Sequence, residues 1–448
     1  MTDKRQPAAQ DSRGLEPKTA LWIFAIALVA RLIWIVTLKN SFYWSDEETF
    51  AGIARHLVHG DGYISDSYRA NFVMPVYMSL VFRFFGENLL IGRLGLSVFG
   101  SLTCVLIGSI AARLFSSRTG LLSGLGLALY PPHIYFAGVF YAEGIMIFWG
   151  AAAVYSAVRA MTSAHRTLWA VAAGVTLGIG SLTRTLVIPW FACICLAWLL
   201  HAGRDWRGWW RPCAALLLAG AACILPWTYR NYLVYHAFIP VQTGFGVSLM
   251  EANNPFSNGS HEDWNLDPGG TLWNDRLAQL PAGEREAVEA EYGPILQKLR
   301  QKPSEMEVCV ANDQVLGPVG VHYLVHHPGH AARCAWRRFQ SLYSPFSQTV
   351  NQNEHTRPIF KLIAALSTYP VFLLAAFGMI RYAARFRRLS LLYLVIGSVT
   401  FLLCIMTGTQ TRYRLTLDPY FMIFAAAFVV QLAQWTGWRD RSAGAPQP

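Results

Sequence analysis

The chain has 448 residues, of which 54% are hydrophobic and only 14% are charged. Its mean hydropathy of +0.31 is higher than that of a soluble globular protein and indicates a membrane protein. The net charge of +11 would also suit a nucleic-acid-binding protein, but the Lys and Arg residues gather in short loops on alternate sides of the apolar segments, so we expect no nucleic-acid partner.

About ten apolar stretches are long enough to cross a ~30 Å hydrocarbon core as helices. The first span contains Arg31 and precedes no small-residue cleavage site, which favours an uncleaved anchor. Basic residues such as Arg113 and Arg118 mark the cytoplasmic side, and they place residues 1–20 and the C-terminus there. The expected spans are residues 21–38, 89–112, 119–132, 139–158, 167–183, 185–201, 212–229, 359–380, 390–407 and 417–436.

Two long segments fall on the outer side. Residues 39–88 contain amphipathic pieces at 51–58 and 76–85, which we expect to be interfacial helices. Residues 230–358 are polar, with a Glu-rich helical pattern at 281–299 and turn signals, and they predict a small mixed periplasmic domain. The expected fold is therefore an all-α polytopic membrane protein. Its parts are a tail (1–20), a transmembrane module (21–229), the loop domain (230–358) and C-terminal helices with a second tail (359–448).

Three consecutive acids, Asp46, Glu47 and Glu48, follow the first span directly. Adjacent carboxylates repel one another, so beside a membrane they are either solvated or used for chemistry. One interpretation makes Asp46 a catalytic base, with Glu47 as a second catalytic acid. The other makes Ser45 a helix N-cap, with Glu48 completing a capping box. Both can hold together, because a helix N-terminus also keeps a carboxylate ionised.

Further polar residues collect on the same outer face. Glu143 opens the fourth span, where it can share a cavity with Asp46 or serve only as a helix-dipole anchor. Arginine forks bind phosphate, although snorkelling to lipid headgroups explains the same positions. The phosphate-binding candidates are Arg69, Arg184, Arg230, Arg412 and Arg414. Trp44, Tyr135 and Tyr141 can stack on sugar rings or form part of an interfacial aromatic belt.

No residue pattern supports a cofactor. The loops contain no Asp-x-Asp and no glycine-rich phosphate cradle, so a nucleotide donor is not expected. His322, His326, His327 and His330 lack the acid of a zinc motif, and a divalent metal is compatible with the chain but unsupported. Cys309 and Cys334 share the outer loop, where they form either a single disulfide or two buried thiols.

Nearly from end to end, the chain resembles the GT-C superfamily of membrane glycosyltransferases, particularly bacterial relatives of protein O-mannosyltransferases and lipid A aminoarabinose transferases. The similar segments are residues 44–50 (WSDEETF), 53–55, 60–63, 75–77, 85–86, 141–143, 182–184, 226–232, 327–329 and 412–415. Asp46 matches the family's catalytic aspartate. Glu143 matches a second-loop acid loosely, because close relatives often carry aspartate there, and fewer spans follow the large loop than in the aminoarabinose transferases.

The resemblance implies an inverting transferase. It would move a sugar from a polyprenyl monophosphate to a lipid, glycan or protein acceptor at the outer face of the bacterial inner membrane. Two other classes are open. A transporter or flippase of lipid-linked sugars would carry ionisable groups at mid-membrane, where only Arg31 lies. A ligase of whole glycans would lack the acid in the first outer loop. Transfer of label to an acceptor, rather than movement across the membrane, separates the first class from the second.

Overall fold

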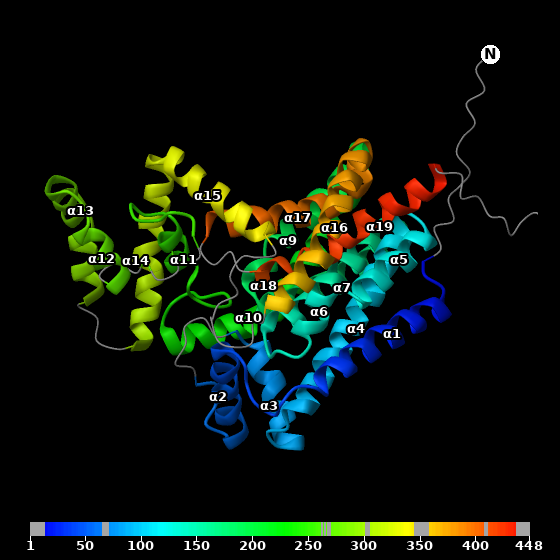
Figure 1. The fold of residues 1–448 in the computed structure, drawn as a ribbon, viewed down its shortest axis with the longest axis horizontal. Helices are drawn as coiled ribbons and strands as arrows, with labels where there is room; N and C mark the ends of the chain where they lie inside the picture. Colours follow the sequence, from blue (N-terminus) through cyan, green and yellow to red (C-terminus); the bar gives the residue numbers. More distant parts are fainter. Residues whose placement is uncertain are drawn as a thin grey trace, which may run out of the picture.

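The chain forms an assembly of helices (Figure 1). The structure is a computed structural model, and it describes residues 14–64, 71–260, 263, 266, 270–300, 305–344, 358–406 and 411–435. These residues contain no β-strand. The N-terminal half comprises α1 (Pro17–Ile35), α2 (Ser45–His59), α3 (Val73–Phe85), α4 (Leu89–Leu114), α5 (Ser117–Ala128), α6 (Pro131–Phe136), α7 (Ala142–Thr162), α8 (Arg166–Thr183), η1 (Thr185–Val187), α9 (Trp190–Ala202), η2 (Gly203–Trp209) and α10 (Trp210–Tyr235). The rest comprises α11 (Phe245–Ala252), α12 (Thr271–Ala278), α13 (Ala282–Arg300), α14 (Glu305–His326), α15 (Pro328–Tyr343), α16 (Pro358–Tyr382), η4 (Ala383–Arg385), α17 (Phe386–Ile405), α18 (Thr411–Arg414) and α19 (Asp418–Trp435).

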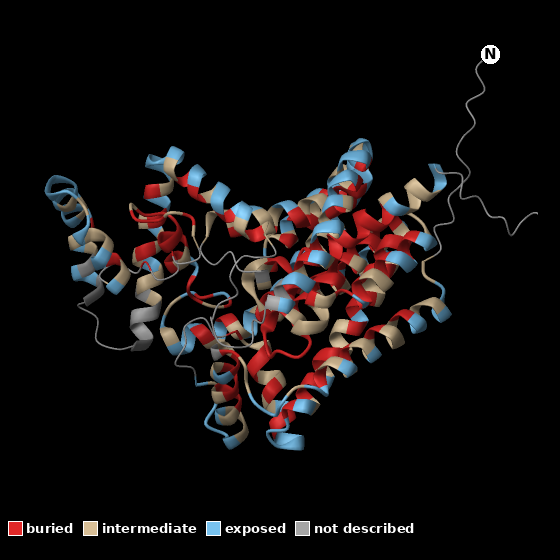
Figure 2. Cartoon of the chain, in the orientation of Figure 1, coloured by how far each residue is buried: buried red, intermediate tan, exposed pale blue. Residues whose placement is uncertain are grey.

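By length and composition, five stretches of the described chain can cross a membrane: Pro17–Ile35, Leu89–Leu114, Ala142–Thr162, Thr185–Tyr235 and Leu362–Ile405. The fourth contains both α9 and α10, and the fifth contains most of α16 and all of α17. The outward faces of α1 and α16 carry exposed apolar side chains, including Leu21, Trp22 and Leu366 (Figure 2). These features fit a multi-pass membrane protein, whereas the number of ten spans stays a prediction.

One expected span is interrupted where the sequence places two prolines. The expected span 119–132 is split into α5 and α6, because Pro131 and Pro132 lack the N–H groups that would continue a helix and instead begin the next one.

Close packing between helices relies on small residues. A Cβ added at Gly174 of α8 would lie 2.3 Å from the Leu216 carbonyl oxygen of α10, so this glycine permits the contact between the two helices.

The amphipathic pieces expected at 51–58 and 76–85 lie inside α2 and α3, which pack against each other (Figure 1). The expected cap of α2 is wrong by one residue. Trp44 is the N-cap, and Glu47 rather than Glu48 returns its carboxylate to the Trp44 N–H at 2.8 Å. The helix therefore starts at Ser45, which places Asp46, Glu47 and Glu48 in its first turn.

The expected outer segment after α10 contains helices and loops but no β-strand among its described residues, so the mixed character expected for it finds no support there. The Glu-rich pattern at 281–299 is α13, as predicted. A small apolar core joins α11 to α14 and contains Val247, Met250, Leu266, Trp273, Tyr292 and Leu316. Later in this segment, α15 packs against α17 and α18, which links the helices between α10 and α16 to the rest of the bundle.

Candidate active site

Asp46 meets an arginine from the opposite end of the chain. Its Oδ2 lies 2.7 Å from Nη1 of Arg412, a residue of α18 that is 366 positions later in the sequence. The Asp46 side chain keeps 39% of its surface exposed, whereas the Arg412 side chain keeps 12%. Asp46 therefore lies on the solvent-exposed side of this ion pair, and Arg412 is its more buried partner.

Glu143 forms the second layer of this cluster. It lies in the first turn of α7, its side chain is only 1% exposed, and Oε1 lies 2.6 Å from Nη2 of Arg184 and 3.9 Å from Nε of Arg412. Its Oε2 has no hydrogen-bond partner among the described residues. The two carboxylates and two guanidinium groups balance in charge, and Glu143 separates the two arginines. We call Asp46, Glu143, Arg184 and Arg412 the four-charge cluster.

Aromatic rings surround the arginines of the four-charge cluster. The Arg412 Cζ lies 4.7 Å from the ring centroid of Tyr141 and 5.0 Å from that of Tyr413, and Arg184 Cζ lies 5.1 Å from the same Tyr413 ring. Arg412 Nη2 also donates to the Tyr413 hydroxyl oxygen at 3.1 Å. Such contacts hold a guanidinium in place without neutralising it. Tyr413 was missed in the sequence interpretation, although it lies between two predicted arginines.

The three aromatic residues predicted to contact a sugar share one cluster. Trp44 and Tyr141 are buried, their ring centroids are 6.2 Å apart, and Tyr135 packs beside them. Most of their surface contacts protein, so they form a wall of the site rather than an open stacking platform.

Glu47, predicted as catalytic, is completely buried and faces the backbone. Its Oε2 accepts from the N–H groups of Tyr43 (2.7 Å) and Trp44 (2.8 Å), and its Oε1 accepts from Phe140 N–H at 2.8 Å. Burial raises the pKa of Glu47, opposed by these three N–H groups and by the nearby Arg93. Because Glu47 is completely buried and both of its oxygens accept hydrogen bonds from backbone N–H groups, its geometry fits a positioning residue.

Two other predicted arginines, Arg414 and Arg230, lie outside the four-charge cluster. Arg414 is fully buried and pairs with Asp418, with Nε 3.4 Å from Oδ1. Arg230 donates to the Tyr63 carbonyl at 2.7 Å and lies over the Trp227 ring. Arg69 falls outside the described residues.

A mostly apolar cavity of about 380 Å³ adjoins the four-charge cluster. It is lined by Arg184 of the cluster and by Tyr413, whose ring lies beside Arg184 and Arg412. Its remaining lining comes from η1 and the residues after it, the segment before α11, and the end of α17: Thr185, Leu186, Ile188, Pro189, Pro240, Val241, Gln242, Thr243, Gly244, Phe245, Ser248, Leu402, Leu403 and Met406. The cavity is thus mostly apolar, with Arg184 among its lining residues.

The described residues hold no group of three or more His, Cys, Asp or Glu side chains suited to a metal ion. His322 and His326 share a helix face, with ring centroids 3.9 Å apart. Cys334 is a buried free thiol, which does not support the disulfide with Cys309.

Residues 70–229 match the model of the dolichyl-phosphate-mannose-protein mannosyltransferase family. A comparison with curated proteins finds no match. Similar solved structures include the oligosaccharyltransferase AglB from Archaeoglobus fulgidus, in complex with an inhibitory peptide and a dolichol-phosphate. It is 13% identical, with a TM-score of 0.56, and the match covers 96% of this chain and 52% of AglB. This chain therefore spans about half the length of AglB. ArnT from Cupriavidus metallidurans bound to undecaprenyl phosphate is 16% identical, with a TM-score of 0.46 and with 96% and 82% covered.

At such low identity, the likeness to AglB establishes the fold. The family match adds a sequence relationship over the first half of the transmembrane bundle. The chain therefore has the GT-C fold that AglB also has, and its residues 70–229 are similar to the dolichyl-phosphate-mannose-protein mannosyltransferase family.

Proposed function

We propose that this protein is an inverting glycosyltransferase that moves a sugar from a polyprenyl monophosphate donor to a hydroxyl or phosphate of a lipid, glycan or protein acceptor. The observation that carries the proposal is the four-charge cluster beside an apolar cavity. A partly exposed carboxylate, two arginines and an apolar chamber are the groups that proton removal, phosphate binding and a lipid tail require. We place the reaction at the periplasmic face of a bacterial inner membrane, with both termini in the cytoplasm.

Donor binding uses both the apolar lining of the cavity and the arginines beside it. The polyprenyl chain fits against Leu402, Leu403 and Ile188, while its phosphate meets Arg184 and then Arg412. Arg412 is paired with Asp46 at 2.7 Å. An entering phosphate competes for this guanidinium and releases the carboxylate, so donor binding prepares Asp46 for its role as base.

In the chemical step, Asp46 accepts the proton of the acceptor O–H group while the acceptor oxygen forms a bond to the anomeric carbon of the sugar. The bond from that carbon to the phosphate oxygen breaks, and its electron pair stays on the phosphate. The donor phosphodiester carries one negative charge, and the departing polyprenyl phosphate carries up to two. Arg184 and Arg412 stabilise the added charge, and this electrostatic stabilisation lowers the barrier most where charge develops. In-line attack inverts the anomeric centre.

The remaining predicted residues receive narrower roles. Glu143 spaces the two arginines, and Glu47 fixes the turn that carries Asp46. Trp44, Tyr141 and Tyr135 form the wall against which the sugar would lie. Arg31, the mid-span charge that suited a transporter, donates to the carbonyls of Ala27 and Ala128 inside the helix bundle, which is a structural use.

The test is transfer of labelled sugar in proteoliposomes. Purified protein, a polyprenyl-phosphate sugar labelled in the sugar, and membrane extract as acceptor source should yield labelled acceptor and free polyprenyl phosphate. Movement of intact donor across the bilayer without any labelled product would overturn the proposal in favour of a flippase. Mass spectrometry of envelope glycans from a deletion strain then identifies the sugar and the acceptor.

A further inference from the structure

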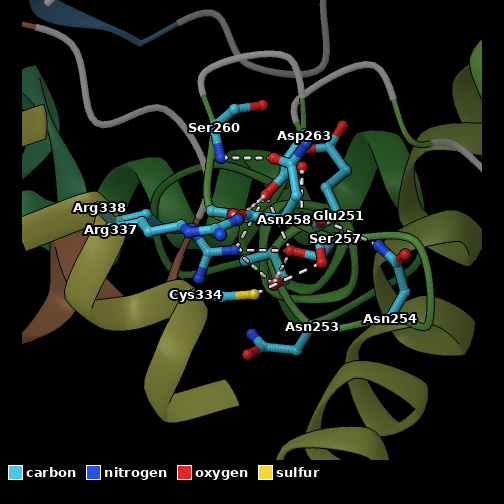
Figure 3. Close-up of polar contacts among 12 residues, drawn as sticks. Glu251, Asn253, Asn254, Ser257, Asn258, Ser260, Asp263, Cys334, Arg337 and Arg338 are labelled. Atoms are coloured by element: carbon cyan, nitrogen blue, oxygen red, sulfur yellow. Dashed lines mark hydrogen bonds and ion pairs between the residues drawn. The ribbon is translucent and has the colours of Figure 1, made fainter. Parts of the chain in front are cut away.

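A buried ion pair in the outer segment lies outside the four-charge cluster. Asp263 and Arg338, a residue of α15, are each 1% exposed, and Arg338 Nη2 lies 3.2 Å from Asp263 Oδ2. The same oxygen accepts from Ser257 Oγ (2.8 Å) and Gly259 N–H (2.8 Å), and Oδ1 accepts from Asn258 N–H at 3.1 Å (Figure 3). Because Asp263 is fully hydrogen-bonded, this ion pair is a structural anchor rather than an open binding site.

From this anchor, contacts run to the end of α17. Arg338 Nη1 donates to the Cys404 carbonyl at 3.2 Å, and Asn253 Nδ2 donates to the Ile405 carbonyl at 2.8 Å. The last four carbonyls of a helix have no partner within the helix, so these side chains cap α17 from outside. Leu402, Leu403 and Met406 at this helix end line the donor cavity.

The helix that carries Arg338 also holds α18. Arg414 Nη1 lies 3.5 Å from the carbonyl oxygens of Leu342 and Ser344, at the end of α15. Tyr343 of α15 shares a hydrogen bond of 2.7 Å with Thr400 of α17. One helix of the outer segment, α15, thus contacts both the end of α17 and the short helix α18, on which Arg412 lies.

We infer that Arg338 and Asp263 are positioning residues for the donor-phosphate site. They fix α15, and α15 fixes the cavity wall and Arg412 relative to Asp46 and Arg184. This inference rests on the proposed function. Arg338 uses both terminal nitrogens, which reach the Cys404 carbonyl on one side and Asp263, Ser257 and the Ala252 carbonyl on the other. A lysine in its place keeps the charge but cannot reach both sides at once.

The experiment measures the affinity for undecaprenyl monophosphate in detergent and the transfer rate for Arg338→Lys. Its matched control is Arg333→Lys, because Arg333 is an exposed arginine on the same helix. A displacement of about 1 Å at a reacting centre can cost a hundredfold in rate, so we expect roughly tenfold to a hundredfold losses for Arg338→Lys and none for Arg333→Lys. Ser257→Ala, which removes one hydroxyl from the anchor, should give a smaller loss in a protein that still folds.

A double-mutant cycle separates positioning from general destabilisation. If Arg338 acts through Arg412, adding Arg338→Lys to Arg412→Lys should weaken lipid phosphate binding little further. Additive losses would overturn the inference, and so would wild-type affinity in both Arg338→Lys and Ser257→Ala while Arg412→Lys binds poorly. If Arg412→Lys itself binds undecaprenyl monophosphate normally, the proposed donor site is wrong and the positioning role falls with it.

Discussion

Replacing Asp46 by Asn keeps the size of the side chain and removes its ability to accept a proton. A positioned general base contributes about a hundredfold to ten-thousandfold, so turnover should fall by that factor, which corresponds to ~3–5.5 kcal/mol in the activation barrier. The cost in stability is much smaller. Asp46 is 39% exposed, and an ion pair this accessible to water contributes at most about 1 kcal/mol. The variant should therefore fold and melt like the wild-type protein while losing its activity.

Donor binding gives the third measurement for this variant. Arg412 loses its carboxylate partner in Asp46→Asn, so the guanidinium is available to phosphate without competition. Affinity for undecaprenyl monophosphate should then equal or exceed that of the wild-type protein. Single-turnover transfer at saturating donor isolates the chemical step from this change in affinity.

Glu48→Gln is the matched control. Glu48 lies two residues away in the same helical turn, but it is exposed and pairs with Arg55 at 2.8 Å, so its loss should leave transfer unchanged. The reasoning is refuted if Asp46→Asn transfers sugar at a near wild-type rate. If Glu143→Gln abolishes transfer at the same time, the base is Glu143, whose Oε2 has no hydrogen-bond partner among the described residues.

Three further predictions address neighbouring residues and topology. Glu47→Gln should destabilise the protein by about 1–3 kcal/mol and lower its melting temperature in detergent. The reason is that the new amide NH₂ group would face backbone N–H groups that now donate hydrogen bonds to the carboxylate. An unchanged melting temperature would contradict the positioning role. Arg412→Lys should weaken the binding of undecaprenyl monophosphate about tenfold to a hundredfold, whereas Arg230→Lys should leave it unchanged. Equal losses of affinity in the two variants would assign Arg230 to the donor site as well. Glu286→Cys, on the exposed face of α13, should react with an impermeant maleimide in intact spheroplasts, while Arg207→Cys should react only after lysis; the reverse pattern would invert the topology.

The sequence was sufficient to predict the membrane class, the helices α2 and α3, and the residues from which the four-charge cluster is built. It could not predict which arginines join that cluster. Arg412 and Arg414 lie in one short motif and looked equivalent, but successive residues of a helix are rotated by about 100°, so two residues apart they point in nearly opposite directions. In α18, this rotation sends Arg412 to Asp46 and Arg414 inward to Asp418.

The same rotation explains why the three consecutive acids were assigned incorrectly in part. A one-residue uncertainty in where a helix begins is common, and at α2 it exchanges the roles of neighbouring side chains. With the helix starting at Ser45, Asp46 faces Arg412, Glu48 faces Arg55 in solvent, and Glu47 points into the protein. No hydropathy pattern distinguishes three adjacent carboxylates, so this division of roles depends on the contacts of the folded chain.

The buried Glu47 acts on the site through the two backbone segments to which its oxygens are hydrogen-bonded. One of its oxygens holds the backbone just before Asp46, and the other holds Phe140 N–H, three residues before Glu143. A single carboxylate therefore ties the start of α2 to the start of α7, and it fixes the distance between the two acids of the four-charge cluster. Loss of Glu47 should consequently reduce transfer as well as stability, because Asp46 and Glu143 would no longer be held in register around Arg412.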